Sequence, residues 1–278
     1  MPKLFRYPGG KWPIRGKIIS CFPPHRTYVD LFGGSASILI AKPPSKVEVY
    51  NDRNEEIVNF FRVVKHRPAE LAEKARYWIH SRVMWKEKKE AENLKDEVAR
   101  AFRFWVTIHD SFGGKGGTFG TCRKKDICSV THARDYIEKV AHRLRSTIIE
   151  CLDFRDCINR YDSPETFFYC DPPYPGTKGG DRNYPQLSRD DWSDLKDILS
   201  KIKGKFLLSS SNVKEVRSFF KGFFITTISV SVMLQNGSKL KNRSKRSELL
   251  IANYKLSKKG REKEERPRGT QRAGIVNL

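Results

Sequence analysis

Hydrophobic residues in this chain gather into short runs that alternate with segments of helical spacing. Several runs are almost continuously apolar and rich in β-branched and aromatic residues, which is typical of strands covered on both faces in a parallel sheet. Seven such runs, each bounded by turn residues, predict strands at residues 27–32, 46–50, 147–152, 166–170, 206–210, 223–232 and 248–253. The pattern therefore predicts an α/β fold with a sheet of about seven strands.

Segments with helical spacing lie between these runs. The clearest helix is expected after Ser188, which can form a capping box with Asp191 ahead of apolar residues spaced by three and four. Two more apolar stripes, over residues 91–108 and 136–144, also have helical spacing. We interpret the side chains of both stripes as core packing.

The interval between the second and third predicted strands indicates a second, inserted unit of structure. It contains no convincing strand and carries both of the latter stripes. We therefore expect residues 59–145 to form an inserted, mostly helical subdomain, and residues 1–58 together with 146–256 to form the main domain. Residues 257–278 hold charges of both signs and little to bury, so we expect a basic, disordered tail.

Charge and cysteine usage narrow the class of protein. The net charge is +22, from 54 Lys and Arg against 32 Asp and Glu, which attracts polyanions and above all nucleic acid, although charge alone does not prove a partner. The first ten residues lack the apolar core of a signal peptide, and no apolar run reaches the roughly 18 residues of a membrane span. The six cysteines are not spaced like zinc ligands. We expect a cytoplasmic, DNA-associated protein with reduced thiols, no metal site and no membrane contact.

Residues 167–174 read Phe-Phe-Tyr-Cys-Asp-Pro-Pro-Tyr and carry the most informative motif. Two prolines cannot continue a central strand, so the chain is stiff where Asp171 leaves the sheet. Open α/β sheets bind ligands at such strand ends. The Asp171 carboxylate, the Pro172 and Pro173 backbone and the Tyr174 ring could hold a base that has been turned out of DNA. The motif predicts methyl transfer to an exocyclic amine at these four residues.

Other strand ends carry residues suited to a nucleoside. The first strand leads into a turn of small residues, which lets a ligand lie against backbone, although many α/β folds have a glycine there. Asp52 ends the second strand about 20 residues later, where a carboxylate can accept both ribose hydroxyls. Asp153 and Phe154 follow the third strand and offer a carboxylate and a ring to an adenine.

Two glycine-rich segments are each open to two interpretations, and neither matches a P-loop. Residues 7–11, Tyr-Pro-Gly-Gly-Lys, form either a loop over the carboxylate of an amino-acid-like cofactor or a plain N-terminal turn. Residues 111–121 contain five glycines and form either a flexible surface loop or a loop that contacts DNA. The candidate phosphate contacts are Lys115, Arg123, Lys124 and Lys125.

The ordered set of motifs resembles the Dam-type, alpha-class (D12) DNA adenine N6-methyltransferases over most of the chain outside the insertion and the tail. The motifs that carry the resemblance are residues 7–11, 30–37, 51–54, 150–154 and 171–174. The family implies a Rossmann-like fold, S-adenosylmethionine as cofactor and double-stranded DNA as substrate. It also implies that the inserted subdomain recognises the target.

The same resemblance implies the cofactor-binding residues, with Asp171 shared between cofactor and base. They are Tyr7, Pro8, Gly9, Gly10, Lys11, Asp30, Phe32, Gly33, Gly34, Ser35, Asp52, Asp153, Phe154 and Asp171. Residues 208–212 resemble the strand and turn that follow the catalytic motif in the family. Two features depart from the family: Ala36 stands where a third glycine is common, and the insertion lacks an Asn-rich aromatic hairpin, so the target sequence is open.

Alternative functions also stay open. N4-cytosine methylation uses the same chemistry, although its enzymes more often carry serine in place of Asp171. RNA or a protein amide would fit a similar fold, but asparagine at that position would favour them. A non-catalytic DNA-binding protein could keep the fold, although acidic and aromatic residues at four strand ends favour an enzyme. The family resemblance is compatible with a cognate restriction endonuclease, and no obligate protein partner is evident.

Overall fold

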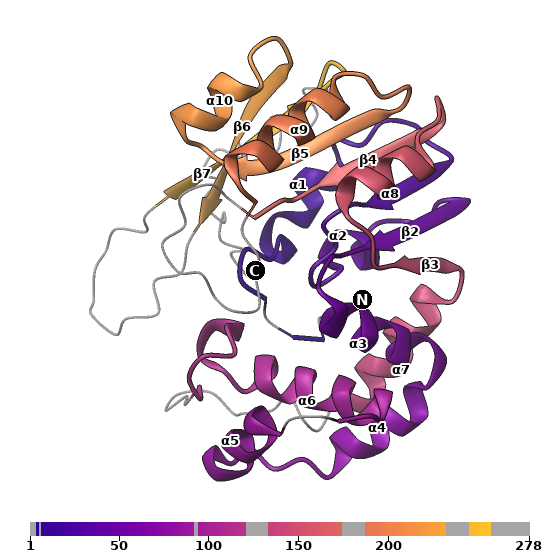
Figure 1. The fold of residues 1–278 in the computed structure, drawn as a ribbon, viewed down its shortest axis with the longest axis vertical. Helices are drawn as coiled ribbons and strands as arrows, with labels where there is room; N and C mark the ends of the chain where they lie inside the picture. The colour runs from indigo at the N-terminus through magenta and orange to yellow at the C-terminus, as the bar shows by residue number, and fades with distance from the viewer. Residues whose placement is uncertain are drawn as a thin grey trace, which may run out of the picture.

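The computed structural model describes residues 4, 5, 7–91, 94–120, 133–173, 187–231 and 245–256. Within them the core is a seven-stranded sheet in the order β3-β2-β1-β4-β5-β7-β6 (Figure 1). Strands β1 to β5 are parallel, and β7 is antiparallel to both of its neighbours. The sheet has the Rossmann-like arrangement that the sequence predicted, and its strand order reverses between β1 and β4, where ligands bind in open α/β sheets.

All seven predicted runs contain a strand. The run 166–170 matches β4 end to end, and the others differ by one to three residues at their ends. The strands are β1 Thr27–Asp30, β2 Val47–Asn51, β3 Thr147–Glu150, β4 Thr166–Cys170, β5 Lys205–Ser211, β6 Phe224–Ser231 and β7 Lys245–Ala252.

Helices connect the strands, and several begin at side-chain caps. Asn54 caps one helix through the Glu56 and Ile57 amides, and Ser188 forms the predicted capping box with Asp191. The helices are η1 Trp12–Ile14, α1 Arg15–Ile19, α2 Ser37–Ala41, α3 Glu55–His66, α4 Pro68–Arg76, α5 Arg82–Glu90, α6 Glu97–His109, η2 Phe112–Gly114, α7 Ala133–Leu144, α8 Phe154–Tyr161, α9 Arg189–Leu199 and α10 Lys214–Phe219.

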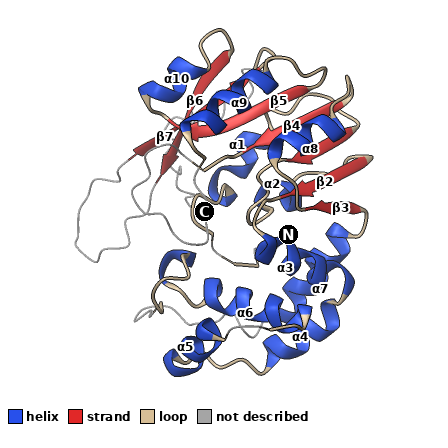
Figure 2. Cartoon of the chain, viewed as in Figure 1, coloured by secondary structure: helices blue, strands red, loops and turns tan. Residues whose placement is uncertain are grey.

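Both faces of the sheet are covered, as the apolar runs predicted. One buried cluster joins the sheet to α8, α9 and α10. A second cluster joins the opposite face to α1, α2 and α3 and continues into α4 to α7. Figure 2 shows α4, α5 and α6 below the sheet, with α3 and α7 between them and the strands.

Helices α4 to α7 fall between β2 and β3 in the chain, where the sequence predicted helical structure. The stripe over residues 91–108 was placed too early, because Asp96 caps α6 and leaves Ala91 and Leu94 outside the helix. The α7 residue Arg143 donates to both carboxylate oxygens of Glu48 in β2, at 2.5 and 2.9 Å. This buried ion pair fixes α7 against the sheet.

Candidate active site

The carboxyl ends of β1, β2 and β4 meet at the switch point of the sheet, with β3 beside β2. Direct contacts join the residues that follow these strands. The amide of Gly34, after β1, donates to the Asp52 carboxylate after β2, at 2.8 Å. The N-terminal segment reaches the same edge, because the Lys11 ammonium contacts Asp171 after β4.

The turn after β1 needs glycine at Gly33 because of a close approach. A Cβ built on Gly33 would lie 2.2 Å from the Tyr50 ring, and the Tyr50 hydroxyl donates to the Gly34 carbonyl at 2.8 Å. Ala36, the departure from the family pattern, has φ +53° and ψ +26°. That left-handed conformation costs an alanine about 1–2 kcal/mol, and a glycine would adopt it without this cost.

The Asp52 carboxylate accepts hydrogen bonds from the backbone and is still partly accessible. Its carboxylate accepts from the Gly34 amide at 2.8 Å and from the Asn54 amide at 2.9 Å. Burial raises the pKa of Asp52, and these two backbone donors act in the opposite direction. The side chain is partly exposed, so its carboxylate has capacity left for ligand hydroxyls.

The sequence indicated Asn51 only as part of a motif. In the structure its side chain links neighbouring strand ends through hydrogen bonds. Its amide nitrogen donates to the carbonyls of Leu31 at 3.0 Å and Leu152 at 3.2 Å. Its amide oxygen accepts from the Leu152 amide at 2.9 Å. One buried side chain therefore connects the ends of β1, β2 and β3.

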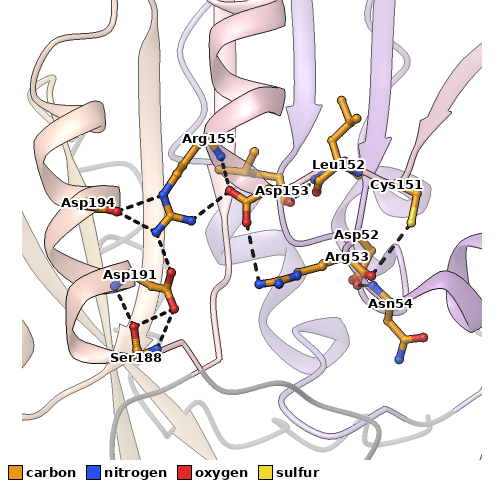
Figure 3. Close-up of polar contacts among 12 residues, drawn as sticks. Asp52, Arg53, Asn54, Cys151, Leu152, Asp153, Arg155, Ser188, Asp191 and Asp194 are labelled. Atoms are coloured by element: carbon orange, nitrogen blue, oxygen red, sulfur yellow. Dashed lines mark hydrogen bonds and ion pairs between the residues drawn. The ribbon is translucent and has the colours of Figure 1, made fainter.

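Asp153 is the N-cap of α8 and lies in a network of arginines (Figure 3). Its Oδ1 accepts from the Arg155 amide and from Arg155 Nη1, both at 3.0 Å. Arg53 Nη1 is 3.8 Å from the other oxygen, Oδ2. The better-satisfied Oδ1 is fixed, which leaves Oδ2 as the oxygen with more capacity to accept from a ligand amine.

Arg155 also ties α8 to α9, which the sequence did not predict. Its guanidinium donates to Asp191 at 2.6 Å and to Asp194 at 2.7 Å (Figure 3). The same guanidinium covers the Phe154 ring at 4.3 Å from the centroid. The bond from Arg155 lowers the pKa of Asp191 to about 2. Phe154 is buried, whereas Phe32, 5.8 Å away between ring centroids, is only half-buried.

The N-terminal segment is a closed turn and not a free lead-in. The Gly10 amide donates to the Tyr7 carbonyl at 3.0 Å, and Gly9 has φ +71°. The Tyr7 ring packs so close to Gly34 that a Cβ there would lie 3.1 Å from it. Residues 7–11 and the turn after β1 thus form one surface, with Pro8 and Ser35 partly exposed on it.

The Asp171 carboxylate contacts polar groups of the N-terminal turn and of β5. Lys11 Nζ lies 2.6 Å from Oδ1 and 2.8 Å from Oδ2, and it also contacts Glu248 at 3.3 Å. The Ser209 hydroxyl donates to Oδ1 at 2.9 Å. The Asp171 side chain is 18% exposed, so its carboxylate is positioned but can still be reached.

Asp30 lies under this cluster and not at its surface. It is 2% exposed, and burial, together with the nearby charge of Asp171, raises its pKa well above the usual value. Cys170 is also fully buried and its pKa is raised by burial, which fits core packing and not nucleophilic chemistry.

The donors and acceptors at this edge fit a nucleoside joined to an amino acid. Carboxylates follow β2 and β3, where hydroxyl and amine donors would be accepted, and a Cβ-free turn follows β1. Lys11 supplies a cation at the end of β4, where it contacts Asp171 and Glu248. Among the described residues no group of His, Cys, Asp and Glu could hold a metal ion, and no helix is long and apolar enough to cross a membrane.

The candidate DNA contacts are described only in part. Residues 111–120 form a closed loop, since the Phe112 amide donates to Thr118 at 2.8 Å and the Gly120 amide to Asp110 at 2.7 Å. Lys115 is exposed on this loop. Arg123, Lys124 and Lys125 lie outside the described residues, as do Tyr174 and the segment 257–278.

Comparisons with known proteins agree on one family. The family model for D12 class N6 adenine-specific DNA methyltransferases matches residues 7–234. The chain is 23% identical over 270 residues to a DNA adenine methylase of Vibrio cholerae, covering 89% of this chain and 94% of that protein. It is 24% identical to a type II methyltransferase of Lactococcus lactis, covering 90% and 94%, and 25% identical to one of Methanocaldococcus jannaschii, covering 90% and 98%.

Proposed function

The chain belongs to the D12 class of N6 adenine-specific DNA methyltransferases, and we propose that it transfers the methyl group of S-adenosylmethionine to N6 of an adenine turned out of double-stranded DNA. The observation that carries this proposal is the position of Asp171. It follows β4 at the switch point, ahead of two prolines, with its carboxylate held by Lys11 and Ser209. A fixed acceptor at this place is what an exocyclic amine requires.

The proposed cofactor site takes its residues from the ends of β1, β2 and β3 and from the N-terminal turn. Asp52 would accept the ribose hydroxyls, and Asp153 Oδ2 with the half-buried Phe32 ring would hold the adenine. Residues 7–11 would cover the amino-acid part, and the turn at residues 33–35 would lie against the ligand through its backbone. When bound, the cofactor supplies an electrophilic methyl group.

The role proposed for the catalytic motif is to make the adenine amine a better nucleophile. The lone pair of N6 is delocalised into the ring, and acceptors for both amine hydrogens favour a tetrahedral nitrogen. Asp171 and the Pro172 carbonyl would be these acceptors, while Tyr174 would stack on the base. Turning out a base costs a few kcal/mol, which stacking and phosphate contacts would offset.

We further propose that residues 1–58 and 146–256 are the catalytic domain and that residues 59–145 recognise the target. Lys115, on the exposed loop after α6, and the cations at residues 123–125 would contact phosphates. Acting on DNA, the enzyme would work in the cytoplasm at the nucleoid. A cognate restriction endonuclease is a further proposal, supported by the names of the two type II relatives.

The test is methyl incorporation from radiolabelled S-adenosylmethionine into unmethylated DNA, followed by chromatography of the nucleosides. We expect label in N6-methyladenine alone. Label in N4-methylcytosine would favour the cytosine alternative, to which the adenine-specific family gives no support. Absence of label in DNA, with cofactor binding measured by calorimetry, would contradict the proposed substrate.

A further inference from the structure

We propose that Ser209 and Tyr169 form a hydrogen-bond relay that sets the orientation of the Asp171 carboxylate, so that both act as positioning residues for methyl transfer. This inference rests on the proposed function, because it gives Asp171 its role as acceptor for the adenine amine. Neither Ser209 nor Tyr169 belongs to the cofactor or catalytic residues proposed above.

The relay follows from the register of two neighbouring strands. Cys170 is paired with Leu208, so Asp171 comes next to Ser209 one position further along. Side chains alternate across a strand, which puts Tyr169, Asp171 and Ser209 on the same face of the sheet. The Tyr169 hydroxyl lies 2.9 Å from Ser209 Oγ, and Ser209 Oγ lies 2.9 Å from Asp171 Oδ1.

The direction of each hydrogen bond is determined by the chemistry of the groups. An ionised carboxylate only accepts, so Ser209 must donate its single hydroxyl proton to Asp171. Ser209 then has only lone pairs to offer Tyr169, and the Tyr169 hydroxyl must donate to it. Burial and the charge of Asp171 raise the pKa of Tyr169 well above its usual value, which keeps this donor protonated.

The relay differs in kind from the contact with Lys11. The lysine ammonium sits on a flexible stem and contacts both carboxylate oxygens, so it balances charge without selecting a carboxylate plane. Ser209 is fully buried, and its hydroxyl is one carbon away from the backbone of a central strand. A bond from so rigid a donor to Oδ1 alone fixes the plane, and therefore the direction in which Oδ2 meets an amine.

The next residue, Ser210, provides a matched control. It lies in the same strand, is equally buried, and faces the opposite side of the sheet. Its Oγ has no hydrogen-bond partner within the described part of the chain. Replacing either serine with alanine removes one buried oxygen from β5, but only Ser209 is connected to Asp171.

The experiment compares Ser209→Ala and Ser210→Ala in methylation of a defined DNA duplex, with kcat and KM measured in the steady state. For Ser209→Ala we expect kcat to fall roughly 10- to 100-fold, the loss expected for a hydrogen bond to a charged group. Its KM for DNA and its affinity for S-adenosylhomocysteine, measured by calorimetry, should stay within about twofold of wild type, because neither depends on the carboxylate plane. Ser210→Ala should keep the wild-type kcat.

A double-mutant cycle with Tyr169→Phe tests the relay itself. Tyr169→Phe alone should lower kcat by a smaller factor than Ser209→Ala. In a protein that already carries Ser209→Ala, Tyr169→Phe should have no further effect on kcat. The reason is that the Ser209 hydroxyl, which connects Tyr169 to Asp171, is then absent. Fully additive effects on kcat would contradict the relay.

The outcomes separate this inference from the proposed function. An active wild type with Ser209→Ala at the wild-type kcat would overturn the relay alone. Equal losses in Ser209→Ala and Ser210→Ala, with matching drops in Tm, would also overturn it, since they would indicate general damage to β5. A wild type that binds S-adenosylhomocysteine but methylates no DNA would overturn the proposed function and the relay with it.

Discussion

The ammonium of Lys11 lies 2.6 and 2.8 Å from the two carboxylate oxygens of Asp171, although 160 positions separate these residues in the chain. The lysine side chain is 5% exposed, so water does little to screen the pair. Glu248 from β7 shares the same ammonium at 3.3 Å. One buried cation thus joins the N-terminal turn, the end of β4 and the antiparallel part of the sheet.

Replacing Lys11 with methionine should therefore lower the rate of catalysis more than the stability of the fold. The variant keeps the length of the stem but leaves Asp171 and Glu248 without the cation that they share. We expect kcat/KM for DNA methylation to fall by at least about tenfold, equivalent to about 1.4 kcal/mol. The measurement is steady-state methyl incorporation, with Lys196→Met as the control, since the Lys196 side chain is 38% exposed and pairs with its neighbour Asp197, far from Asp171 in the described part of the chain.

Equal activities of Lys11→Met and Lys196→Met would contradict this role of Lys11. A loss of activity that followed a large drop in Tm would assign Lys11 to stability.

Asp52→Asn should weaken cofactor binding with little effect on DNA affinity. The amide keeps one acceptor for the backbone donors Gly34 and Asn54 but loses the second acceptor and the charge. We expect the Kd for S-adenosylhomocysteine to rise about 10-fold or more, from the loss of one hydrogen bond to a charged group. Calorimetry measures this value directly, and an unchanged Kd would remove Asp52 from the proposed cofactor site.

Two substitutions in the turn after β1 should differ in their effect on stability. Gly33→Ala would drive a Cβ into the Tyr50 ring, so we expect a loss of stability of about 1–3 kcal/mol and weaker cofactor binding. Ala36→Gly relieves a left-handed alanine but removes a buried methyl group, and we expect stability within about 1 kcal/mol of wild type. Thermal unfolding of both variants is the measurement. A Gly33→Ala variant as stable as wild type would contradict the close approach of Gly33 to the Tyr50 ring.

Asp30 should make stability depend on pH. Burial and the charge of Asp171 raise its pKa in the folded state, so the stability it contributes is full below the unfolded pKa, near 3.8, and is lost as pH rises through the folded value. Asp30→Asn cannot ionise and escapes this loss. The Tm difference between Asp30→Asn and wild type should therefore shift in favour of the variant as pH rises above about 4.

A fixed difference in Tm between the two proteins across pH 4 to 8 would contradict that assignment. Such a result would indicate that only the packing of the amide distinguishes the variant.

The sequence was enough to predict the strands and the edge where the site lies, because its signals were local. Apolar runs defined β4 to the residue, and Asp171 followed by two prolines identified a strand end. The insertion was predicted as helical, but the stripe over residues 91–108 began too early because apolar spacing carries no information on where Asp96 caps the helix.

Contacts between distant segments were beyond local reasoning. The bond from Ser209 to Asp171 depends on the register of β4 against β5, which places Leu208 opposite Cys170. Arg155 meets Asp191 and Asp194 only because α8 and α9 lie side by side on the sheet. In the same way, Asn51 connects three strand ends through hydrogen bonds that a motif cannot show.

The central claim, that Asp171 positions the adenine amine for methyl transfer, is tested most directly by Asp171→Asn in single-turnover methylation. Binding of S-adenosylhomocysteine and of target duplex is measured on the same preparations. The account predicts a fall in the rate of N6-methyladenine formation of at least about 100-fold, with DNA affinity within a few-fold of wild type. A variant that binds both ligands and forms N6-methyladenine at a rate close to that of wild type would contradict it.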